Sequence, residues 1–424
     1  MEQSLIDEAD RCVQCGLCLP HCPTYNLSLS EAESPRGRIA LIRAMASGAL
    51  SISKSLNAHL SRCLGCRACE AVCPSEVNYG GLLDNGRAWM RQHPTGKIKN
   101  DGLTSFLIHT FTKPNRLQFL GRWLARYQGS ALQGMVRTSK ILGHGKLRGL
   151  EEDLPSVPTQ SPLQQDYPTP GLSRGTVGLF TGCASSLFGR DVIVAAIYVL
   201  NRCGYSVHIP QDQTCCGALH QHYGEPQIAR RHCESNIAAF SKPGVDAIIS
   251  LASGCGATLS EYGTLATQKG SAKSFVNKHY DISDFLNHIS WPKGVQCAPL
   301  KETVAIHEPC TMRNVLRCEQ APYQLLKRIP ELEIKPLEQN DQCCGAAGLY
   351  NVIHPQLAAS LGAQKREHLS TSGATVLVTS NIGCAMQLGA VIRKTSLNIR
   401  VAHPIELVAQ QLGKGRDTKN EGHL

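Results

Sequence analysis

The sequence predicts a protein of mixed class, in which a mostly helical α+β domain at the N-terminus precedes two duplicated α/β domains. Three observations support this prediction. One cysteine spacing occurs twice between residues 12 and 74, a proline-rich stretch covers residues 151–175, and four cysteines recur later with a period near 128 residues. A chain of 424 residues is long enough to form several such domains, each with its own core.

The repeated cysteine spacing is C-x2-C-x2-C-x3-C-P, and the second copy follows the first by 51 residues. Bacterial ferredoxins hold [4Fe-4S] clusters with this spacing, and the fourth cysteine of each run ligates the other cluster. We therefore expect one cluster on Cys12, Cys15, Cys18 and Cys73, and a second on Cys63, Cys66, Cys69 and Cys22. Zinc and disulfides are the alternatives, but zinc sites usually pair two cysteine hooks across a longer gap. Residues 1–100 are thus predicted to form a two-cluster, ferredoxin-like domain.

A helix is expected between the two cysteine runs. Ser34 suits the N-cap and Pro35 the first turn, so the helix should extend to about Ala46. Arg36 and Arg38 on this helix would lie near the clusters and stabilise their negatively charged reduced state. The alternative is that both arginines are solvated side chains.

Residues 101–150 form a strongly basic segment. They contribute +7 to the net charge of +10, and they also carry several aromatic side chains. Apolar residues recur there with helical spacing, while Arg122 and Arg126 lie on the opposite face. Such a helix can pack on its own domain, dock on an acidic partner subunit or rest on an anionic membrane. No nucleic-acid-binding motif accompanies the charge, so we expect no nucleic-acid partner.

The stretch 151–175 is expected to be a linker, because its five prolines among polar residues resist both helix and sheet. Upstream, the acidic N-terminus does not resemble a secretory signal. The longest apolar run, residues 192–200, is too short to span a bilayer. We expect a cytoplasmic protein, with peripheral contact at the inner face of the cytoplasmic membrane as an additional option.

A duplication covers the remainder of the chain. The matching cysteines are Cys183 with Cys310, Cys215 with Cys343, Cys216 with Cys344, and Cys255 with Cys384. Short apolar segments suited to strands lie at 177–180, 207–210, 247–251, 304–306 and 375–378, and helices are expected at 192–202 and near 323–328. Alternating strands and helices indicate mostly parallel sheets, in two α/β units at 176–300 and 301–415. The cysteines follow the strand ends, where ligands gather in such folds.

The chain resembles the family of glycolate oxidase iron-sulfur subunits, which combine a two-cluster ferredoxin-like region with two cysteine-rich CCG domains. The stretches that carry the resemblance are Cys15-Gly16-Leu17-Cys18, Cys22-Pro23-Thr24-Tyr25, Pro35-Arg36-Gly37-Arg38-Ile39, residues 62–73, residues 252–257, Glu261-Tyr262-Gly263 and Asn381-Ile382-Gly383-Cys384. The resemblance extends over nearly the whole chain. It implies that the two α/β units are CCG domains.

The CCG modules of heterodisulfide reductases end in C-x2-C and carry a non-cubane cluster. Here Thr258 and Gln387 stand where the fifth cysteine of each module would be, which argues against that cluster type. Four cysteines per module leave an ordinary cluster, a zinc ion or no metal as alternatives, and we favour an iron-sulfur centre in at least one module. The unduplicated cysteines, Cys203, Cys233, Cys297 and Cys318, are expected to be buried free thiols. His220, His222 and His307 lie near these motifs and could each be a metal ligand or a proton carrier, but we interpret them as structural histidines with satisfied hydrogen bonds.

The chain offers no place for substrate chemistry of its own, so no catalytic residue is assigned. A G-x-G-x-x-G fingerprint and a P-loop are missing from the sequence, and we expect no flavin on this chain. The resemblance implies an iron-sulfur subunit that takes electrons from a flavin on partner subunits of a glycolate oxidase. Two [4Fe-4S] clusters would then pass them to a quinone-type acceptor. The alternatives are the same role with D-lactate or glycerol 3-phosphate, a heterodisulfide-reductase-like thiol-disulfide enzyme, and a stand-alone carrier.

Overall fold

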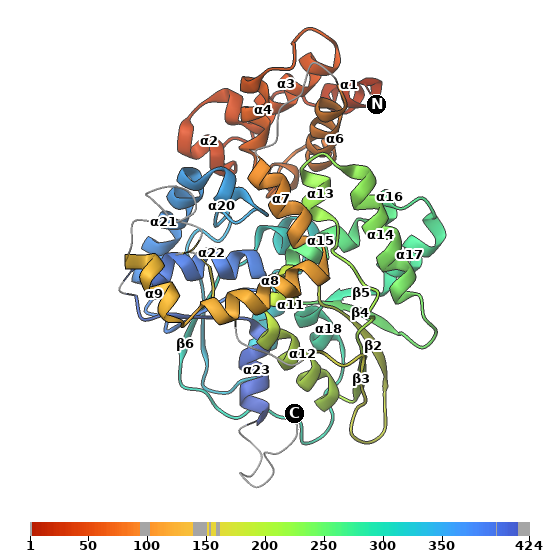
Figure 1. The fold of residues 1–424 in the computed structure, drawn as a ribbon, viewed down its shortest axis with the longest axis vertical. Coiled ribbons are helices and arrows are strands. Elements are labelled where there is room, and N and C mark those ends of the chain that lie inside the picture. The colour runs from red at the N-terminus through yellow and green to blue at the C-terminus, as the bar shows by residue number, and fades with distance from the viewer. Residues whose placement is uncertain are drawn as a thin grey trace.

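The computed structural model describes residues 2–93, 102–138, 151, 154–157, 162–395 and 397–413. A helical region at the N-terminus lies at one end of the molecule, above two mostly parallel sheets with their helices (Figure 1). This architecture confirms the predicted fold class.

The N-terminal region is built from short helices around one apolar core. Its helices are α1 (Glu2–Asp10), α2 (Pro23–Ser28), η1 (Glu31–Glu33), α3 (Pro35–Ala46), α4 (Lys54–Ser61), α5 (Ala68–Ala71) and α6 (Tyr79–Gln92). As predicted, Ser34 caps α3, and its hydroxyl accepts a hydrogen bond from the Gly37 backbone N–H at 2.9 Å. Leu5, Ile42, Leu60 and Leu83 are buried between these helices. Cys69 belongs to this core, and Cys12, Cys18, Cys63 and Cys73 pack against it.

The basic segment forms α7 (Gly102–Phe111), α8 (Pro114–Tyr127) and α9 (Ala131–Thr138). Helix α8 confirms the helical spacing, but its buried stripe is narrower than predicted. Leu117 is buried. Gly121 lies next to Leu187, at the point where α8 packs against α11 (Ala184–Phe188). Leu120, expected beside Leu117, is exposed. In the described part of the chain, no helix is both long and apolar enough to cross a membrane.

The first sheet has the order β1-β3-β2-β4-β5. Its strands are β1 (Asp166–Tyr167), β2 (Gly175–Phe180), β3 (Tyr205–His208), β4 (Ala247–Ser250) and β5 (His279–Asp281). All pairings are parallel except that of β1 with β3. Strand β1 lies inside the stretch expected to resist sheet structure. Asp166 and Tyr167 fall between prolines, so they can add a short antiparallel edge strand.

The second sheet has the order β7-β6-β8-β9 and is parallel throughout. Its strands are β6 (Thr303–Ile306), β7 (Glu333–Pro336), β8 (Val376–Val378) and β9 (Arg400–Ala402). Strands β6, β7, β8 and β9 occupy the places of β2, β3, β4 and β5, so the duplication seen in the cysteines is also a duplication of the fold.

Helices cover both sheets (Figure 1). Those of the first unit are α11, α12 (Arg190–Arg202), α13 (Ala218–His222), α14 (Pro226–Phe240), α15 (Ser253–Ser260), α16 (Tyr262–Leu265), α17 (Lys269–Lys278) and α18 (Ile282–His288). Those of the second are η4 (Met312–Leu316), α19 (Ala321–Leu326), α20 (Tyr350–Ile353), α21 (Pro355–Thr371), α22 (Ile382–Arg393) and α23 (Pro404–Gly413). One apolar core joins the units: Val177 and Ile249 of the first sheet belong to the same buried cluster as Val304 and Val376 of the second.

Candidate functional site

The first predicted cluster set lines a cavity at the N-terminal end of the molecule. Cys12, Cys15, Cys18 and Cys73 all face it, together with apolar side chains such as Ile39. The loop that carries them turns at Gly16, whose φ of +84° suits glycine. Four thiols around one cavity are a donor set that fits a [4Fe-4S] cluster. Their role as ligands stays a prediction.

The second set lies deeper. Cys22 and Cys69 are buried. Burial, reinforced by the neighbouring thiols of Cys66, Cys63 and Cys22, raises the pKa of Cys69 well above its ordinary value. Burial also raises the pKa of Cys66, with Cys63 and Cys22 again among the nearby thiols. The structure thus gathers the four cysteines that the exchanged-ligand pattern groups together. Because cluster ligands are thiolates, loading this set must displace protons.

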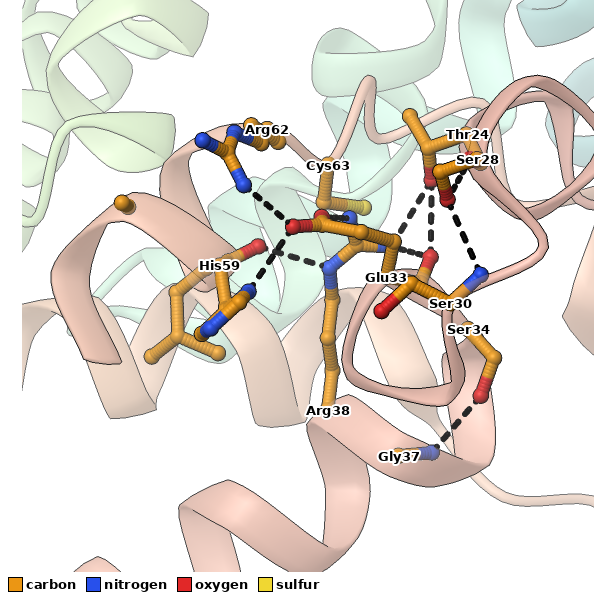
Figure 2. Close-up of polar contacts among 12 residues, drawn as sticks. Thr24, Ser28, Ser30, Glu33, Ser34, Gly37, Arg38, His59, Arg62 and Cys63 are labelled. Atoms are coloured by element: carbon orange, nitrogen blue, oxygen red, sulfur yellow. Dashed lines mark hydrogen bonds and ion pairs between the residues drawn. The ribbon is translucent and has the colours of Figure 1, made fainter. Parts of the chain in front are cut away.

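A charged network around the buried Glu33 and Arg38 lies beside the second set (Figure 2). The Glu33 carboxylate accepts hydrogen bonds from Arg38 at 2.7 Å and Arg62 at 2.6 Å, and it lies 2.8 Å from the His59 ring. Arg38 is fully buried, so the interpretation of a solvated arginine is wrong for this residue. Its guanidinium lies near the Cys63 and Cys22 thiols, where its positive charge favours thiolates.

Arg36 has a different position from Arg38. It pairs with Glu31 at 2.6 Å and donates a hydrogen bond to the Gln14 carbonyl at 3.0 Å. It therefore ties the first cysteine loop to η1 and lines the cavity of the first set. Arg36 is partly exposed, so its charge is screened more strongly than that of Arg38.

The first CCG unit collects its four cysteines at the carboxyl ends of β2, β3 and β4. Cys183 and Cys215 have their sulfur atoms 3.7 Å apart. Hydrogen bonds from the Cys215 and Cys255 thiols lower the pKa of Cys216. Cys255 lies in the first turn of α15, and the hydrogen bond to Cys216 together with burial raises its pKa.

The glycine of each Cys-Cys-Gly motif has a steric reason. Gly217 and Gly345 have φ values of +92° and +89°, a conformation that disfavours residues with a Cβ. A Cβ at either position would also meet the backbone of a helix, α14 in the first unit or α21 in the second, about 3 Å from the carbonyl oxygen of Ala229 or Ala358. Glycine therefore allows the paired cysteines to lie against that helix.

The second CCG unit repeats the arrangement. Cys310, Cys343 and Cys344 follow β6 and β7, and Cys384 lies in the first turn of α22. The sulfur atoms of Cys344 and Cys384 are 3.2 Å apart. The hydrogen bond to Cys343 and burial raise the pKa of Cys310. Four converging thiols fit a metal centre in each unit, and the occupant stays a prediction.

The second predicted cluster set lies against the second CCG unit, which the sequence did not reveal. Cys66, Cys310 and Cys343 contact one apolar cluster that also contains Tyr350. The Asn314 side chain donates a hydrogen bond to the Cys66 carbonyl at 2.8 Å, and the Tyr350 hydroxyl donates one to the Arg62 carbonyl at 3.0 Å. These contacts join residues about 250 or more positions apart in the chain. The spacing of cysteines within one motif cannot predict contacts between segments so far apart in the chain.

The remaining cysteines and histidines mostly follow expectation. Cys203, Cys233 and Cys297 are buried, Cys318 is partly buried, and all four are free thiols. The His220 ring lies 2.6 Å from Glu225 and 3.1 Å from Thr112. The His222 ring lies 3.1 Å from Asp84. His307 differs: it is buried, and neither ring nitrogen has a hydrogen-bond partner among the described residues. The interpretation of a satisfied structural histidine is wrong there.

Three protein-family models match this chain, and the matched segments correspond in order to the regions of its structure. Residues 8–77 match the 4Fe-4S dicluster domain, and residues 177–260 and 304–389 match the cysteine-rich domain abbreviated CCG. Between them, residues 100–152 match a family described as the linker region of the glycolate oxidase iron-sulfur subunit. The basic helices α7, α8 and α9 fall in this linker match.

Curated relatives match over nearly the full length. The chain is 35% identical to the probable glycolate oxidase iron-sulfur subunit of Bacillus subtilis, covering 96% of this chain and 95% of the relative. It is 30% identical to the glycolate oxidase iron-sulfur subunit of Escherichia coli, covering 95% and 94%. Lactate utilization protein A 2 of Bacillus cereus is 27% identical over 56% of this chain and 99% of its own length. The chain belongs to the family of glycolate oxidase iron-sulfur subunits.

Proposed function

We propose that this chain is the electron-transfer subunit of a flavin-dependent glycolate oxidase complex. It would take electrons from a flavin on partner subunits and deliver them, by way of two [4Fe-4S] clusters, to a quinone-type acceptor. Substrate oxidation would take place on the flavoprotein partner. When bound, the clusters supply one-electron chemistry, which a flavin can couple to the two-electron oxidation of a 2-hydroxy acid.

One observation carries this proposal: the cysteine sets follow one another from the surface to the interior. Cys69 of the second set also lines the cavity of the first. Cys66 of the second set lies beside Cys310 of the second CCG unit. Three groups of thiols are therefore neighbours in order, although they come from segments far apart in the chain. A stand-alone carrier would not need this continuity.

The protein's own residues prepare the path in two ways. Arg38 places a buried positive charge beside Cys22 and Cys63, which offsets the negative charge of thiolates. Burial of Cys66 and Cys69 excludes water and lowers the local dielectric around the second set. Tyr79 contributes further, since its hydroxyl lies 3.5 Å from the Cys63 sulfur.

The proposal is tested on the co-expressed complex with its flavoprotein subunits. Glycolate should reduce an artificial dye and a quinone, and Cys66→Ser should abolish quinone reduction while the flavin is still reduced by substrate. Cys318→Ser is the matched control, because Cys318 belongs to none of the four cysteine sets, and its activity should match wild type. Quinone reduction unchanged in Cys66→Ser would contradict the proposed path.

D-lactate is the second candidate substrate, because the matched relatives include lactate utilization proteins. The same complex assayed with glycolate, D-lactate and glycerol 3-phosphate separates the candidates. Activity with D-lactate and none with glycolate would replace the first proposal by the second. Reduction of a heterodisulfide by the chain alone would instead favour the thiol-disulfide alternative.

We also propose that α8 and α9 rest on the anionic inner surface of the cytoplasmic membrane. Phe119, Trp123 and Met135 are more than half exposed on these helices. Arg122 and Arg126 are exposed beside them. Aromatic side chains that enter the headgroup region, combined with basic residues that contact anionic lipids, are typical of peripheral membrane helices. Such contact would bring the subunit to a membrane quinone.

A further inference from the structure

The second CCG unit contains a buried histidine, His307, whose imidazole ring makes no hydrogen bond to the described residues. His307 directly follows β6 and is 1% exposed. Neither of its ring nitrogens has a hydrogen-bond partner among the described residues. One of them forms a group with the sulfur atoms of Cys344 and Cys384, in which all ligand atoms lie within 4.8 Å of one another. A buried imidazole without partners therefore lies beside two thiols.

An unsatisfied imidazole in this place requires an explanation, because buried polar groups are nearly always hydrogen-bonded. The buried His220 is satisfied on both ring nitrogens, by Glu225 and Thr112. The charged neighbours of His307 include Lys365 and Arg313, which carry hydrogen-bond donors and no acceptor for a ring N–H. A neutral imidazole keeps a lone pair free for a metal ion, which is the form in which histidine acts as a ligand.

The first CCG unit shows what a module without this ligand looks like. The residue three positions before Cys183 is Phe180, and the residue three positions before Cys310 is His307. Phe180 pairs with Ser250 of β4, and the His307 backbone N–H likewise bonds to the end of β8. Phe180 lies in the apolar cluster that contains the first unit's cysteines. A phenyl ring therefore fills this position in the first unit, and an imidazole fills it in the second.

We infer that His307 supplies a nitrogen ligand to a metal centre of the second CCG unit, beside Cys344 and Cys384. The first unit would then have an all-thiolate donor set and the second a mixed thiolate-imidazole set. This inference rests on the proposed presence of a metal in the second unit. Zinc and the iron of an iron-sulfur cluster both accept thiolate and imidazole together.

The mixed donor set has an electrostatic consequence. Where the neutral imidazole of His307 takes the place of one of the four thiolates as a ligand, the centre carries less negative charge. Lys365 adds a buried ammonium group near Cys343 and Cys344. Asn236 occupies the equivalent place in the first unit, at the offset that relates Pro226 to Pro355. The centre next to Cys66 is therefore the less negative of the two, and in iron-sulfur centres histidine ligation raises the reduction potential.

The test uses the full chain, purified anaerobically, with zinc, iron and acid-labile sulfide measured per chain. X-ray absorption at the zinc and iron edges then counts nitrogen and sulfur ligands. His307→Phe copies the residue of the first unit, and His307→Cys replaces one metal ligand by another. His403→Phe is the control for loss of a buried histidine in the same unit, since His403 accepts a hydrogen bond from the Ile405 N–H instead.

His307→Phe should lose the nitrogen ligand and leave a sulfur-only ligand set like that of the first unit, and His307→Cys should retain the metal with a sulfur ligand in place of the nitrogen. His403→Phe should keep wild-type metal content and ligand counts. Loss of the nitrogen ligand at the zinc edge identifies a zinc site, and its loss at the iron edge identifies an iron-sulfur cluster. Unchanged ligand counts in His307→Phe would overturn the inference, as would a wild-type second unit without metal. Neither result would contradict the proposed function. That function is tested separately, by the iron and sulfide content of the two predicted cluster sets in the N-terminal region and by quinone reduction.

Discussion

Replacing Glu33 by glutamine should destabilise the N-terminal region far more than removing any of its exposed ion pairs. Glu33 is 5% exposed, and its carboxylate contacts Arg38, Arg62 and His59 (Figure 2). Glutamine keeps the shape but removes the negative charge, which leaves the guanidinium of Arg38 buried without its counter-ion. Breaking a buried ion pair in this way costs about 3–5 kcal/mol. The hydrogen bonds from Arg38 to the carbonyls of Glu33 and His59 remain in place.

Arg62→Gln is the matched control, because it removes a partner of the same carboxylate from the solvent side. The Arg62 side chain is 41% exposed, so its contribution is screened and amounts to roughly 1 kcal/mol or less. Comparing the two variants therefore separates the stability lost when a buried charge loses its partner from the stability lost when an exposed ion pair is removed. Both leave every predicted cluster ligand intact.

The assay is thermal unfolding of the anaerobic holo-protein, followed by circular dichroism and by bleaching of the cluster absorbance. For a cooperative unit of 60–100 residues, 1 kcal/mol shifts Tm by about 4–8 °C. Glu33→Gln should therefore lower the temperature of cluster bleaching by about 10 °C or more, and Arg62→Gln by much less. Equal shifts in both variants would refute the view that the buried Arg38 charge dominates.

The remaining predictions concern the CCG units and the basic helices. Asp281 caps α18 and is buried, and burial raises its pKa to about 7, against 3.8 in the unfolded chain. Stability should therefore fall by up to about 4 kcal/mol as pH rises from 4 to 7, because only the folded state retains this proton there. Asp281→Asn should remove that dependence of Tm on pH. If the variant has the same Tm as wild type at every pH, the raised pKa of Asp281 is contradicted. Arg122→Glu with Arg126→Glu should weaken binding to anionic vesicles by at least about 2 kcal/mol, or roughly thirtyfold in a flotation assay. Lys242→Glu with Lys293→Glu makes the same change in net charge away from these helices and should leave vesicle binding near wild type, whereas equal weakening would indicate a net-charge effect alone.

The fold could be predicted where the local pattern is strong. Buried parallel strands such as β2 and β4 are apolar runs that end in turn residues, and both were located closely. None of the four edge strands, β1, β5, β7 and β9, is predicted, because each is short and most of its side chains are partly or fully exposed. Prolines around β1 strengthened the expectation of a linker. At the edge of a sheet, a residue between prolines can still pair on one side.

The candidate site likewise has features that the local sequence predicts and features that depend on the tertiary structure. Ligand sets within one cysteine run follow from spacing, since a loop of fixed length places its thiols together. The approach of Cys66 to Cys310 depends on how two folded surfaces dock, which no local pattern encodes. From the sequence, His307 is a possible ligand, but a structural role is favoured because buried histidines are usually hydrogen-bonded. Its position three residues before Cys310, with Phe180 as its counterpart, was the available signal.

The two CCG units share a fold but meet the N-terminal region in chemically different ways. The first unit does so through polar pairs: His222 with Asp84 at 3.1 Å and Glu225 with Arg91 at 2.8 Å. The second unit does so through the apolar cluster around Leu64 and Tyr350, which contains cysteines from both sides. Water-excluding contact between thiol sites suits electron transfer, whereas paired charges fix an orientation. The first unit therefore holds the N-terminal region through paired charges, and the second packs its cysteines against those of the N-terminal region.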